Sequence, residues 1–310
     1  MTTSVALCTF NGEKFLKEQL DSILNQTVTI DEIIVCDDGS TDATISILNS
    51  YKEKFPEIFN IYINEENLRS VKNFEKAMLL CKNEIIFLSD QDDIWEKNKV
   101  EKCLDFFKKE EEIDVFCSNA FIINEKGEKL EKNTIWDIFK LFKQNNIQYN
   151  YFQIFNLIGN IATGANMAFR KKIVNNILPL PEKNFHHDEW IALVSSSNNS
   201  FCFVDEKINN YRIHSDQQVG GVFFDNKKNR EDKLLQRFNI YNPNDDFRLL
   251  KRRFKIIKDK KNKILSIDNY QKKTLFEKML NSIENYEKFL KQNLKKKNLL
   301  KYFIFKLLYF

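Results

Sequence analysis

Short apolar runs alternate with helical patterns along the first part of the chain. The runs at residues 4–9, 33–36, 58–63 and 85–88 have the length and composition of buried β-strands. Between them, apolar residues recur at the spacing of an amphipathic helix. Strands that alternate with helices in this way form βαβ units with parallel strands. The sequence therefore predicts an α/β fold with a mostly parallel central sheet flanked by helices.

Polar residues follow three of the predicted strands. The first strand is followed by Thr9 and Asn11, the second ends at Asp37 and Asp38, and the fourth runs into residues 90–92, Asp-Gln-Asp. Ligands of parallel sheets bind beyond the carboxyl ends of the strands. We therefore expect a binding site at this edge. The chain lacks G-x-G-x-x-G and G-x-x-x-x-G-K-[ST] motifs, which argues against a dinucleotide enzyme or a P-loop ATPase.

The acidic residues Asp90, Asp92 and Asp93 come directly after a buried apolar run. Carboxylates crowded at such a place repel one another unless a cation lies among them. Mg²⁺ or Mn²⁺ typically binds one or two protein carboxylates together with phosphate oxygens. The cluster therefore predicts a metal that holds a phosphorylated ligand. The alternative is a solvated turn before a helix, where Asp is also common.

The three histidines lie in two polar segments. The first segment is Phe-His-His-Asp-Glu-Trp at residues 185–190, and the second begins at His214 after a predicted strand. Their concentration there favours a functional role. Asp188 could instead be an ordinary helix-capping residue, and His214 an ordinary histidine at a strand end.

Charge is distributed unevenly along the chain. Residues 225–310 contain 24 Lys and Arg against 10 Asp and Glu, a net charge of +14, whereas residues 1–224 contain 24 against 34, a net charge of −10. This asymmetry separates an acidic body from a basic tail. We therefore predict two domains, 1–224 and 225–310, the second a Lys-rich helical region.

The six cysteines are scattered and show no C-x-x-C pairing. A chain of this size with scattered cysteines and no signal peptide is typical of a reduced, cytoplasmic protein. No apolar run approaches the roughly 20 residues of a membrane span, so the chain is not expected to cross a bilayer.

Five motifs within residues 3–220 follow one another in the order that is typical of a known protein family. They are S-V-A-L-C-T-F-N-G, I-I-V-C-D-D-G-S-T-D, N-L-R-S-V-K-N-F, F-L-S-D-Q-D-D-I-W, and H-D-E-W followed by Y-R-I-H. In this the chain resembles family-two glycosyltransferases of the GT-A fold, which make bacterial surface polysaccharides. The S-D-Q-D-D-I-W form is most similar to the branch that contains rhamnosyltransferases and related hexosyltransferases.

The resemblance implies a role for each matching position. Asp188 would be the catalytic base. A Mn²⁺ or Mg²⁺ ion would be held by Asp92 and His214. The remaining implied contacts are with the acceptor (Gly164, His187 and Trp190) and with the nucleotide-sugar (Thr9, Asn11, Asp37, Asp38, Lys72, Asp90 and Gln91). Two positions depart from the family pattern, because His187 replaces an acidic residue and Arg69 replaces a glycine.

The implied reaction is an inverting sugar transfer. The donor would be dTDP-rhamnose or a UDP-hexose, and the acceptor a hydroxyl of a saccharide, lipid-linked, in O-antigen, capsule or lipooligosaccharide synthesis. The metal and Lys72 would stabilise the departing diphosphate. An ionised Asp188 would take the proton of the attacking hydroxyl.

Apolar stripes at helical spacing continue through the basic region, at residues 247–257 and 276–290. These helices could pack on the body or on a second copy in a homodimer. Residues 299–310, rich in aromatic residues and lysine, instead favour an interfacial helix on anionic lipid. We therefore expect a cytoplasmic protein that is peripheral on the inner face of a bacterial plasma membrane. No recognition motif points to nucleic acid.

Three other functions were compatible with parts of the pattern. Asp37-Asp38-Gly39-Ser40 suggests a phosphoryl transferase, but those enzymes carry D-x-D-x-T after the first strand. A nucleotidyltransferase would have a Gly-rich basic loop near residues 8–20, which this chain lacks. A non-catalytic, membrane-associated nucleotide-sugar scaffold is disfavoured because Asp90, Asp92 and Asp188 are all retained.

Overall fold

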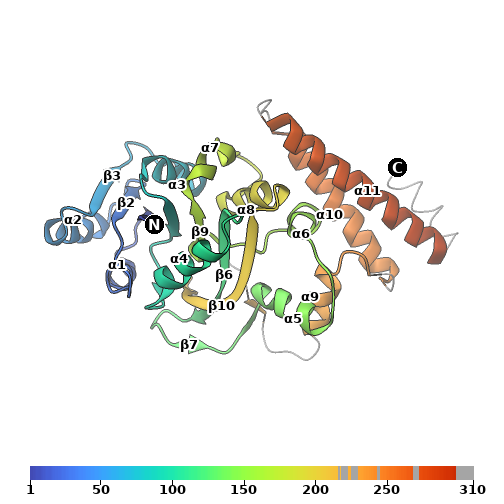
Figure 1. The fold of residues 1–310 in the computed structure, drawn as a ribbon, viewed down its shortest axis with the longest axis horizontal. Helices are drawn as coiled ribbons and strands as arrows, with labels where there is room; N and C mark the ends of the chain where they lie inside the picture. The colour runs from blue at the N-terminus through green and yellow to red at the C-terminus, as the bar shows by residue number, and fades with distance from the viewer. Residues whose placement is uncertain (216, 218–222, 225–229, 243–244, 268–271, 298–310) are drawn as a thin grey trace. The chain divides into compact units, whose positions relative to one another are not determined.

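The computed structural model describes residues 1–310 except 216, 218–222, 225–229, 243–244, 268–271 and 298–310. The chain forms two units (Figure 1). The first comprises Met1–Lys140 and Ile161–Lys227, and the second comprises Leu141–Asn160 and Lys228–Phe310. This division differs from the predicted domains, 1–224 and 225–310, because residues 141–160 join the C-terminal helices.

A single mixed sheet forms the centre of the first unit. In the described part of the chain it joins nine strands in the order β3-β2-β1-β4-β9-β6-β10-β5, with β7 paired to β6. A second, two-stranded sheet pairs β8 (Asn133–Thr134) with β11 (Phe223–Phe224). The strands of the main sheet are β1 (Thr3–Thr9), β2 (Glu32–Asp37), β3 (Phe59–Ile63), β4 (Ile85–Ser89), β5 (Ile94–Trp95), β6 (Val115–Ile123), β7 (Lys129–Leu130), β9 (Met167–Arg170) and β10 (Phe201–Arg212).

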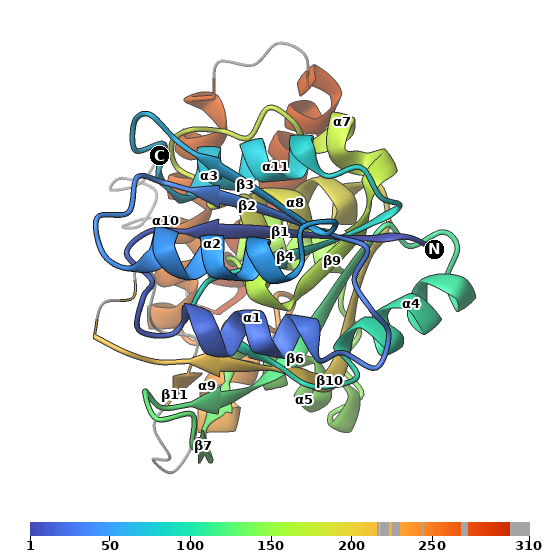
Figure 2. The same ribbon diagram turned by 90° about the vertical axis from the view of Figure 1, so that its left-hand side faces the viewer.

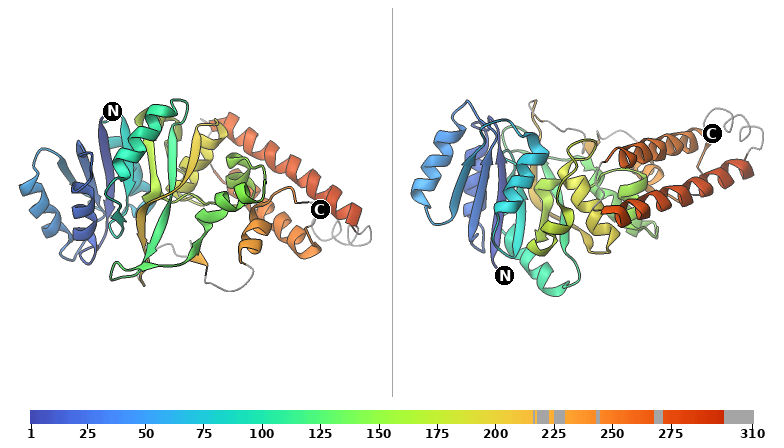
Figure 3. Two further views of the ribbon diagram at one scale, coloured as in Figure 1. Left: turned by 60° about the horizontal axis from the view of Figure 1, so that its bottom comes forward. Right: turned by 90° about the horizontal axis from the view of Figure 1, so that it is seen from above.

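Most neighbouring strands of this sheet are parallel. The pairs β1–β2, β1–β4, β2–β3 and β6–β10 are parallel, whereas β9 runs antiparallel between β4 and β6. The long β6 and β10, green and gold in Figure 3, lie side by side. The prediction of an α/β fold with a mostly parallel sheet is confirmed. Because β1, β2 and β4 are parallel, the polar residues that follow them meet at one edge.

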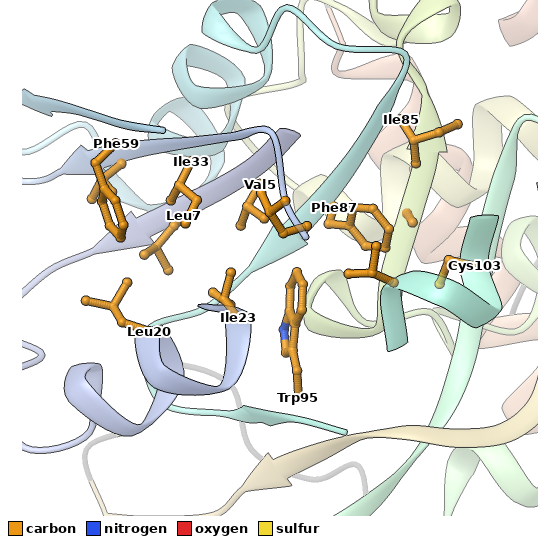
Figure 4. Close-up of a cluster of buried hydrophobic side chains, with 14 of the residues drawn as sticks. Val5, Leu7, Leu20, Ile23, Ile33, Phe59, Ile85, Phe87, Trp95 and Cys103 are labelled. Carbon is orange, nitrogen blue, oxygen red and sulfur yellow. The ribbon is translucent and has the colours of Figure 1, made fainter. Parts of the chain in front are cut away.

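Helices cover both faces of the sheet (Figure 2). On one face, Val5, Ile33 and Phe87 of the strands pack with Leu20 and Ile23 of a helix in a buried core (Figure 4). The opposite face of β1 and β2 is covered by α3. The helices of this unit are α1 (Leu16–Leu24), α2 (Thr44–Lys54), α3 (Arg69–Leu80), α4 (Lys99–Lys109), α7 (Val174–Ile177) and α8 (His187–Ser197), while α5 (Ile138–Gln144) contains the boundary between units.

Two local features differ from what their residue types favour. Serine is typical of a helix N-cap, but the Ser40 hydroxyl donates to Asp37 and accepts from the Asn11 N–H, and α2 begins at Thr44. Residues 201–204 and 208–213 have the composition of two short strands, separated by polar residues. The structure has one strand, β10, whose register against β6 shifts between Val204 and Lys207. The polar residues between the two predicted strands lie at this irregularity, so the pairing continues past them.

The second unit is helical. Its helices are α6 (Tyr151–Leu157), α9 (Arg230–Phe238), α10 (Phe247–Leu265) and α11 (Lys273–Lys297). The predicted apolar stripes are buried, with Leu250, Phe254 and Ile257 on α10 and Ile283 and Leu290 on α11. Because α6 packs against both α10 and α11, residues 141–160 belong with this unit.

No helix among the described residues is both long and apolar enough to cross a membrane. The predicted membrane-binding segment, residues 299–310, lies outside the residues that the structure describes.

Candidate active site

The carboxyl end of β2 carries a fully buried acid, Asp37. Its Oδ2 accepts from Thr9 Oγ1 at 2.7 Å and from Ser40 Oγ at 2.6 Å, and its Oδ1 accepts from the N–H groups of Gly39 and Ser40 at 3.1 and 2.8 Å. Both carboxylate oxygens are therefore bound within the chain. Asp37 joins the ends of β1 and β2 and holds Thr9 in place.

The next acid, Asp38, holds the start of α3. Its Oδ1 accepts from Asn64 Nδ2 at 2.8 Å and from the Leu68 N–H at 2.7 Å, and its Oδ2 accepts from the Arg69 N–H at 2.8 Å. Arg69 has a φ of 61°, a left-handed conformation in which glycine is favoured. The position where the family pattern has glycine therefore keeps a glycine-like backbone, stabilised by Asp38.

The loops after β1 and β4 are joined by Gln91. Its Oε1 accepts from the Phe10 N–H at 2.8 Å and its Nε2 donates to the Phe10 carbonyl at 3.0 Å. A Cβ at position 12 would lie 2.2 Å from Gln91 Oε1, so a larger residue there would push the Gln91 amide out of these two bonds. Asn11 has a φ of 48°, and its Oδ1 accepts from the Thr41 N–H at 2.8 Å. Gln91 and Asn11 thus fix the shape of the loops.

The two predicted metal ligands lie together although they are far apart in sequence. His214 Nε2 is 2.8 Å from Asp92 Oδ2, and the His214 ring packs on Phe15 with centroids 4.9 Å apart. His214 Nδ1 has no hydrogen-bond partner within the described part of the chain. The carboxyl end of β10 therefore places an imidazole beside the acidic loop after β4.

Arg212 fastens β10 to this acidic loop. Its backbone N–H donates to Asp93 Oδ1 at 3.0 Å and its Nε donates to the Asp92 carbonyl at 2.7 Å. Its guanidinium also pairs with Glu18 and lies over the Phe15 ring. Sequence reasoning missed Arg212 as a site residue, although it stands two positions before His214 in the Y-R-I-H motif.

A buried polar network lies beneath the site. Asp93 Oδ2 accepts from Asn209 Nδ2 at 2.9 Å, and Asn209 Nδ2 also donates to Asn166 Oδ1 at 3.0 Å. Burial and the nearby Asp92 charge raise the pKa of Asp93 to about 7. Lys99 donates to the Ala165 carbonyl at 2.7 Å, and burial lowers its pKa to about 8. This network was also missed, because buried polar residues follow no periodic pattern.

Asp90 is repelled by three other acids of the site. Burial raises its pKa well above the ordinary value, and repulsion by Asp92, Asp93 and Asp188 raises it further. Asp188, from a distant segment, thus contributes to the same electrostatic environment as the loop after β4. A cation at this place would remove the repulsion.

Asp188 lies in the first turn of α8. Its Oδ1 accepts from the Glu189 N–H at 2.6 Å and its Oδ2 from the Gly164 N–H at 3.3 Å. Burial raises its pKa to about 6, although these two N–H groups act in the opposite direction. Asp188 is therefore ionised at neutral pH, yet is more basic than an exposed aspartate. The predicted helix start at this segment is confirmed.

His187, beside it, is buried without polar partners. Its ring stacks on Phe74 with centroids 4.1 Å apart, and only 8% of the residue is exposed. Neither ring nitrogen has a hydrogen-bond partner among the residues described. Burial lowers its pKa to about 3, so the imidazole is neutral. Gly164 packs on it so closely that a Cβ there would lie 2.5 Å from His187 Nε2.

Two predicted site residues, Trp190 and Lys72, make their contacts away from the acidic loop after β4. Trp190 has no exposed surface, and its Nε1 donates to the Ile177 carbonyl at 2.8 Å, so it supports α8 from within the core. Lys72 Nζ lies 2.9 Å from Glu75 Oε1 and 3.8 Å from Glu182 Oε1. In the described structure these contacts connect Lys72 to acids outside the Asp90–Asp93 loop.

The side chains of the site suit a divalent ion whose coordination is completed by a bound substrate. Within the part of the chain that is described, no group of three or more His, Cys, Asp and Glu side chains could hold an ion. Asp92 and His214 together supply two metal ligands. Mg²⁺ or Mn²⁺ commonly takes its remaining ligands from substrate phosphates and water. The residues present therefore fit a metal bound together with a diphosphate.

Comparison with known sequences identifies relatives. A profile described as Glycosyl transferase family 2 matches residues 4–178, more than half of the chain. An uncharacterized glycosyltransferase of Haemophilus influenzae is 26% identical over 76% of this chain and 72% of that protein. The dTDP-rhamnosyl transferase RfbG of Shigella flexneri is 29% identical over 69% of this chain and 73% of that protein. A chondroitin synthase of Escherichia coli is 30% identical over 55% of this chain, which spans only 25% of that protein.

Solved structures show the same fold. TarS 1–349 of S. aureus in complex with UDP-GlcNAc matches with a TM-score of 0.55 at 17% identity, over 96% of this chain and 80% of that chain. The mannosyltransferase PcManGT of Pyrobaculum calidifontis, in complex with GDP-Man and Mn²⁺, matches with a TM-score of 0.52 at 13% identity, over 95% of this chain and 74% of that chain. The fold is therefore GT-A, as predicted.

Proposed function

This chain belongs to glycosyl transferase family 2, and from that premise we propose that it is an inverting, metal-dependent hexosyltransferase. The donor is dTDP-rhamnose or a UDP-hexose, and the acceptor is a hydroxyl of a saccharide. The observation that carries the proposal is the approach of His214 to Asp92 at 2.8 Å, beside the repelling acids of the same loop. This arrangement suits a diphosphate held through a divalent ion.

The nucleotide-sugar occupies the edge formed by β1, β2 and β4. Thr9, Asn11, Asp37, Asp38 and Gln91 shape its nucleotide site through the loop contacts described above. Asp90 faces the ribose side. The proposed contact of Lys72 with the donor phosphates requires its ammonium group to leave Glu75 and Glu182, and the 28% exposure of its side chain allows this movement.

Asp92 and His214 would hold Mn²⁺ or Mg²⁺. When bound, the ion supplies positive charge that stabilises a departing diphosphate. Arg212 keeps the Asp92 loop and the end of β10 in register, because it bonds to Asp92 and Asp93 together. Asp93 and Asn209 hold the loop from below.

Asp188 acts as the general base. It accepts the proton of the acceptor hydroxyl as that oxygen forms a bond to the anomeric carbon. The bond from the same carbon to the phosphate oxygen breaks, and the electron pair leaves with the nucleoside diphosphate. A single displacement of this kind inverts the anomeric centre. A pKa of about 6 keeps Asp188 ionised at neutral pH while making it a better proton acceptor.

The acceptor lies near the start of α8. Gly164 and His187 face it, and Trp190 supports them from the core. We propose a lipid-linked saccharide in the synthesis of O-antigen, capsule or lipooligosaccharide. The basic second unit then holds a cytoplasmic enzyme peripherally on the inner face of a bacterial plasma membrane. A homodimer through the C-terminal helices belongs to the same proposal.

A thermal-shift panel tests the function. UDP-, dTDP- and GDP-sugars are each added with and without Mn²⁺ or Mg²⁺, since a ligand that binds the folded state raises its apparent stability. We expect a metal-dependent shift with one nucleotide family, abolished in Asp92→Asn. Asp105→Asn, which changes an exposed acid of α4 that pairs with Lys108, is the control. The absence of any shift in folded protein would overturn the proposal, whereas a shift without turnover of any candidate acceptor would favour the non-catalytic nucleotide-sugar scaffold.

A further inference from the structure

The second unit contains a groove that the proposed chemistry does not use. It lies between α6 and α11, has a volume of about 520 Å³, and is open to solvent. Both helices are labelled in Figure 1. This volume is within the roughly 300–1,000 Å³ that is usual for ligand pockets. A buried hydrogen bond from Asn156 Nδ2 to the Met279 carbonyl, 2.9 Å long, joins the two helices beneath it. The groove therefore has a fixed base.

Uncharged polar side chains dominate its lining. Asn150 and Gln153 contribute from the α6 side, and Asn281 and Asn285 from α11, together with two hydroxyl side chains of α11. An amide presents both donors and an acceptor, which is the complement of a sugar hydroxyl that donates and accepts. Four amides around one groove can therefore pair with several hydroxyls of one saccharide.

Aromatic rings complete the lining. Phe152 and Tyr241 both face the groove, and 46% of Tyr241 is exposed. The Tyr241 ring is held by edge-on contacts with Tyr286 and Phe289, at centroid distances of 5.8 and 5.0 Å. Its hydroxyl accepts from Gln153 Nε2 at 3.0 Å. A partly exposed ring in a fixed position offers an apolar surface on which the C–H face of a pyranose can pack.

The charge of the groove suits a neutral ligand. Among the described residues that line it, Glu277 and Lys278 are the charged ones, and their charges cancel. Recognition of phosphate groups would require a cluster of cations. Recognition of a peptide by strand addition would require a free strand edge, whereas helices form both walls.

From these observations we infer that the α6–α11 groove is a second saccharide-binding site, which takes a neutral stretch of a polysaccharide through amide hydrogen bonds and stacking on Tyr241. The choice of a bacterial surface polysaccharide as its ligand rests on the proposed function. The groove itself is defined by residues outside the catalytic machinery.

The test uses the full chain and oligosaccharides released from bacterial capsules and O-antigens. An array identifies the oligosaccharides that bind, and titration calorimetry then gives their affinities for each variant. Tyr241→Ala is expected to weaken binding about tenfold, through loss of the stacking surface. Asn285→Ala, a change at an exposed position, is expected to weaken it about threefold to tenfold. Tyr149→Ala, which removes another exposed tyrosine of the same unit outside the groove, should bind like wild type.

The outcomes separate this inference from the proposed function. Binding that is weakened by these factors in both groove variants and unchanged in Tyr149→Ala and Asp188→Asn supports the groove. The inference is overturned if the groove variants bind with wild-type affinity. It is also overturned if a protein that shows the donor-dependent thermal shift binds no oligosaccharide. Both outcomes leave the proposed transferase function intact. Groove-dependent binding in a protein without any donor shift would instead overturn the proposed function alone.

Discussion

The two sides of the candidate active site differ in how their buried polar atoms are satisfied. On the donor side, both oxygens of Asp37 and Asp38 and both ends of the Gln91 amide are bound within the chain. On the acceptor side, both ring nitrogens of His187 are buried without a described partner. An unsatisfied buried nitrogen costs stability. The proposed donor loops after β1 and β2 are thus prearranged by the fold, whereas the proposed acceptor side holds buried nitrogens without a partner among the described residues. His214 Nδ1, beside Asp92, is likewise buried without a described partner.

The largest effect should come from the base on the acceptor side. Asp188→Asn keeps the shape of the side chain but removes its ability to accept a proton. We expect kcat to fall by roughly 10²–10⁴-fold. Turnover is measured with the donor found in the thermal-shift panel, and Asp105→Asn, at an exposed acid of α4, provides the surface control.

The pH profile of the same pair of proteins sharpens this test. Asp188 has a raised pKa of about 6, so it is protonated, and inactive as a base, below that pH. Wild-type kcat should therefore fall as pH drops through about 6, and the residual activity of Asp188→Asn should lack this step. If Asp188→Asn keeps the wild-type kcat, or if its kcat falls below about pH 6 as in the wild type, Asp188 is not the general base.

The second effect, on stability, concerns the donor side. Asp37→Ala leaves the Thr9 and Ser40 hydroxyls and two backbone N–H groups without their acceptor. We expect the free energy of unfolding to fall by about 3 kcal/mol, because bonds to a buried charged group are lost. Urea unfolding measures the change. Asp105→Ala, which breaks an exposed ion pair with Lys108, should cost less than about 1 kcal/mol. If both variants lost the same free energy of unfolding, the structural role of the Asp37 hydrogen bonds would be contradicted.

The third prediction tests the contact between the β1 and β4 loops. Gly12→Ala places a Cβ against Gln91 and should displace the loop, raising KM for the donor about tenfold. Gln91→Ala removes the side chain that a Cβ at position 12 would meet, and it also removes the two hydrogen bonds to Phe10. The double variant should therefore be no worse than Gln91→Ala alone, since effects of contacting residues do not add. Additive increases in KM would show that the two loops act independently.

The smallest effect separates stability from function on the acceptor side. His187→Phe keeps the ring against Phe74 and removes the two unpartnered nitrogens. We expect the free energy of unfolding to rise by about 1 kcal/mol while acceptor KM increases. His186→Phe, at the exposed position before the helix, should change neither quantity. A destabilised His187→Phe protein would show that the nitrogens are satisfied in solution.

Periodic features of the chain were predictable, and the polar interior was not. The apolar runs predicted β1, β2 and β4 because strand burial depends on local composition, and the acids after them follow from the parallel arrangement. Lys99, Asn209 and Arg212 were missed because each is buried through partners distant in sequence. The pairing of Asp92 with His214 was expected from the family resemblance rather than from spacing.

Two errors have a common origin. Residues 141–160 were placed with the first domain, and Trp190 was expected at the acceptor. Apolar and aromatic residues indicate burial, but they do not indicate which core receives them. Residues 141–160 pack with the helices of the second unit, and Trp190 fills the interior beneath α8.

The position of β10 in the chain has a consequence for synthesis on the ribosome. The acids after β4 emerge more than a hundred residues before Asn209, Arg212 and His214, which stabilise them. A nascent chain that has released only the earlier strands therefore carries an incomplete site with uncompensated charge. We expect the capacity to bind metal and nucleotide to arise late in translation, when β10, the last strand of the main sheet to be synthesised, inserts beside β6. Truncated chains that end before β10 would then remain inert toward the donor.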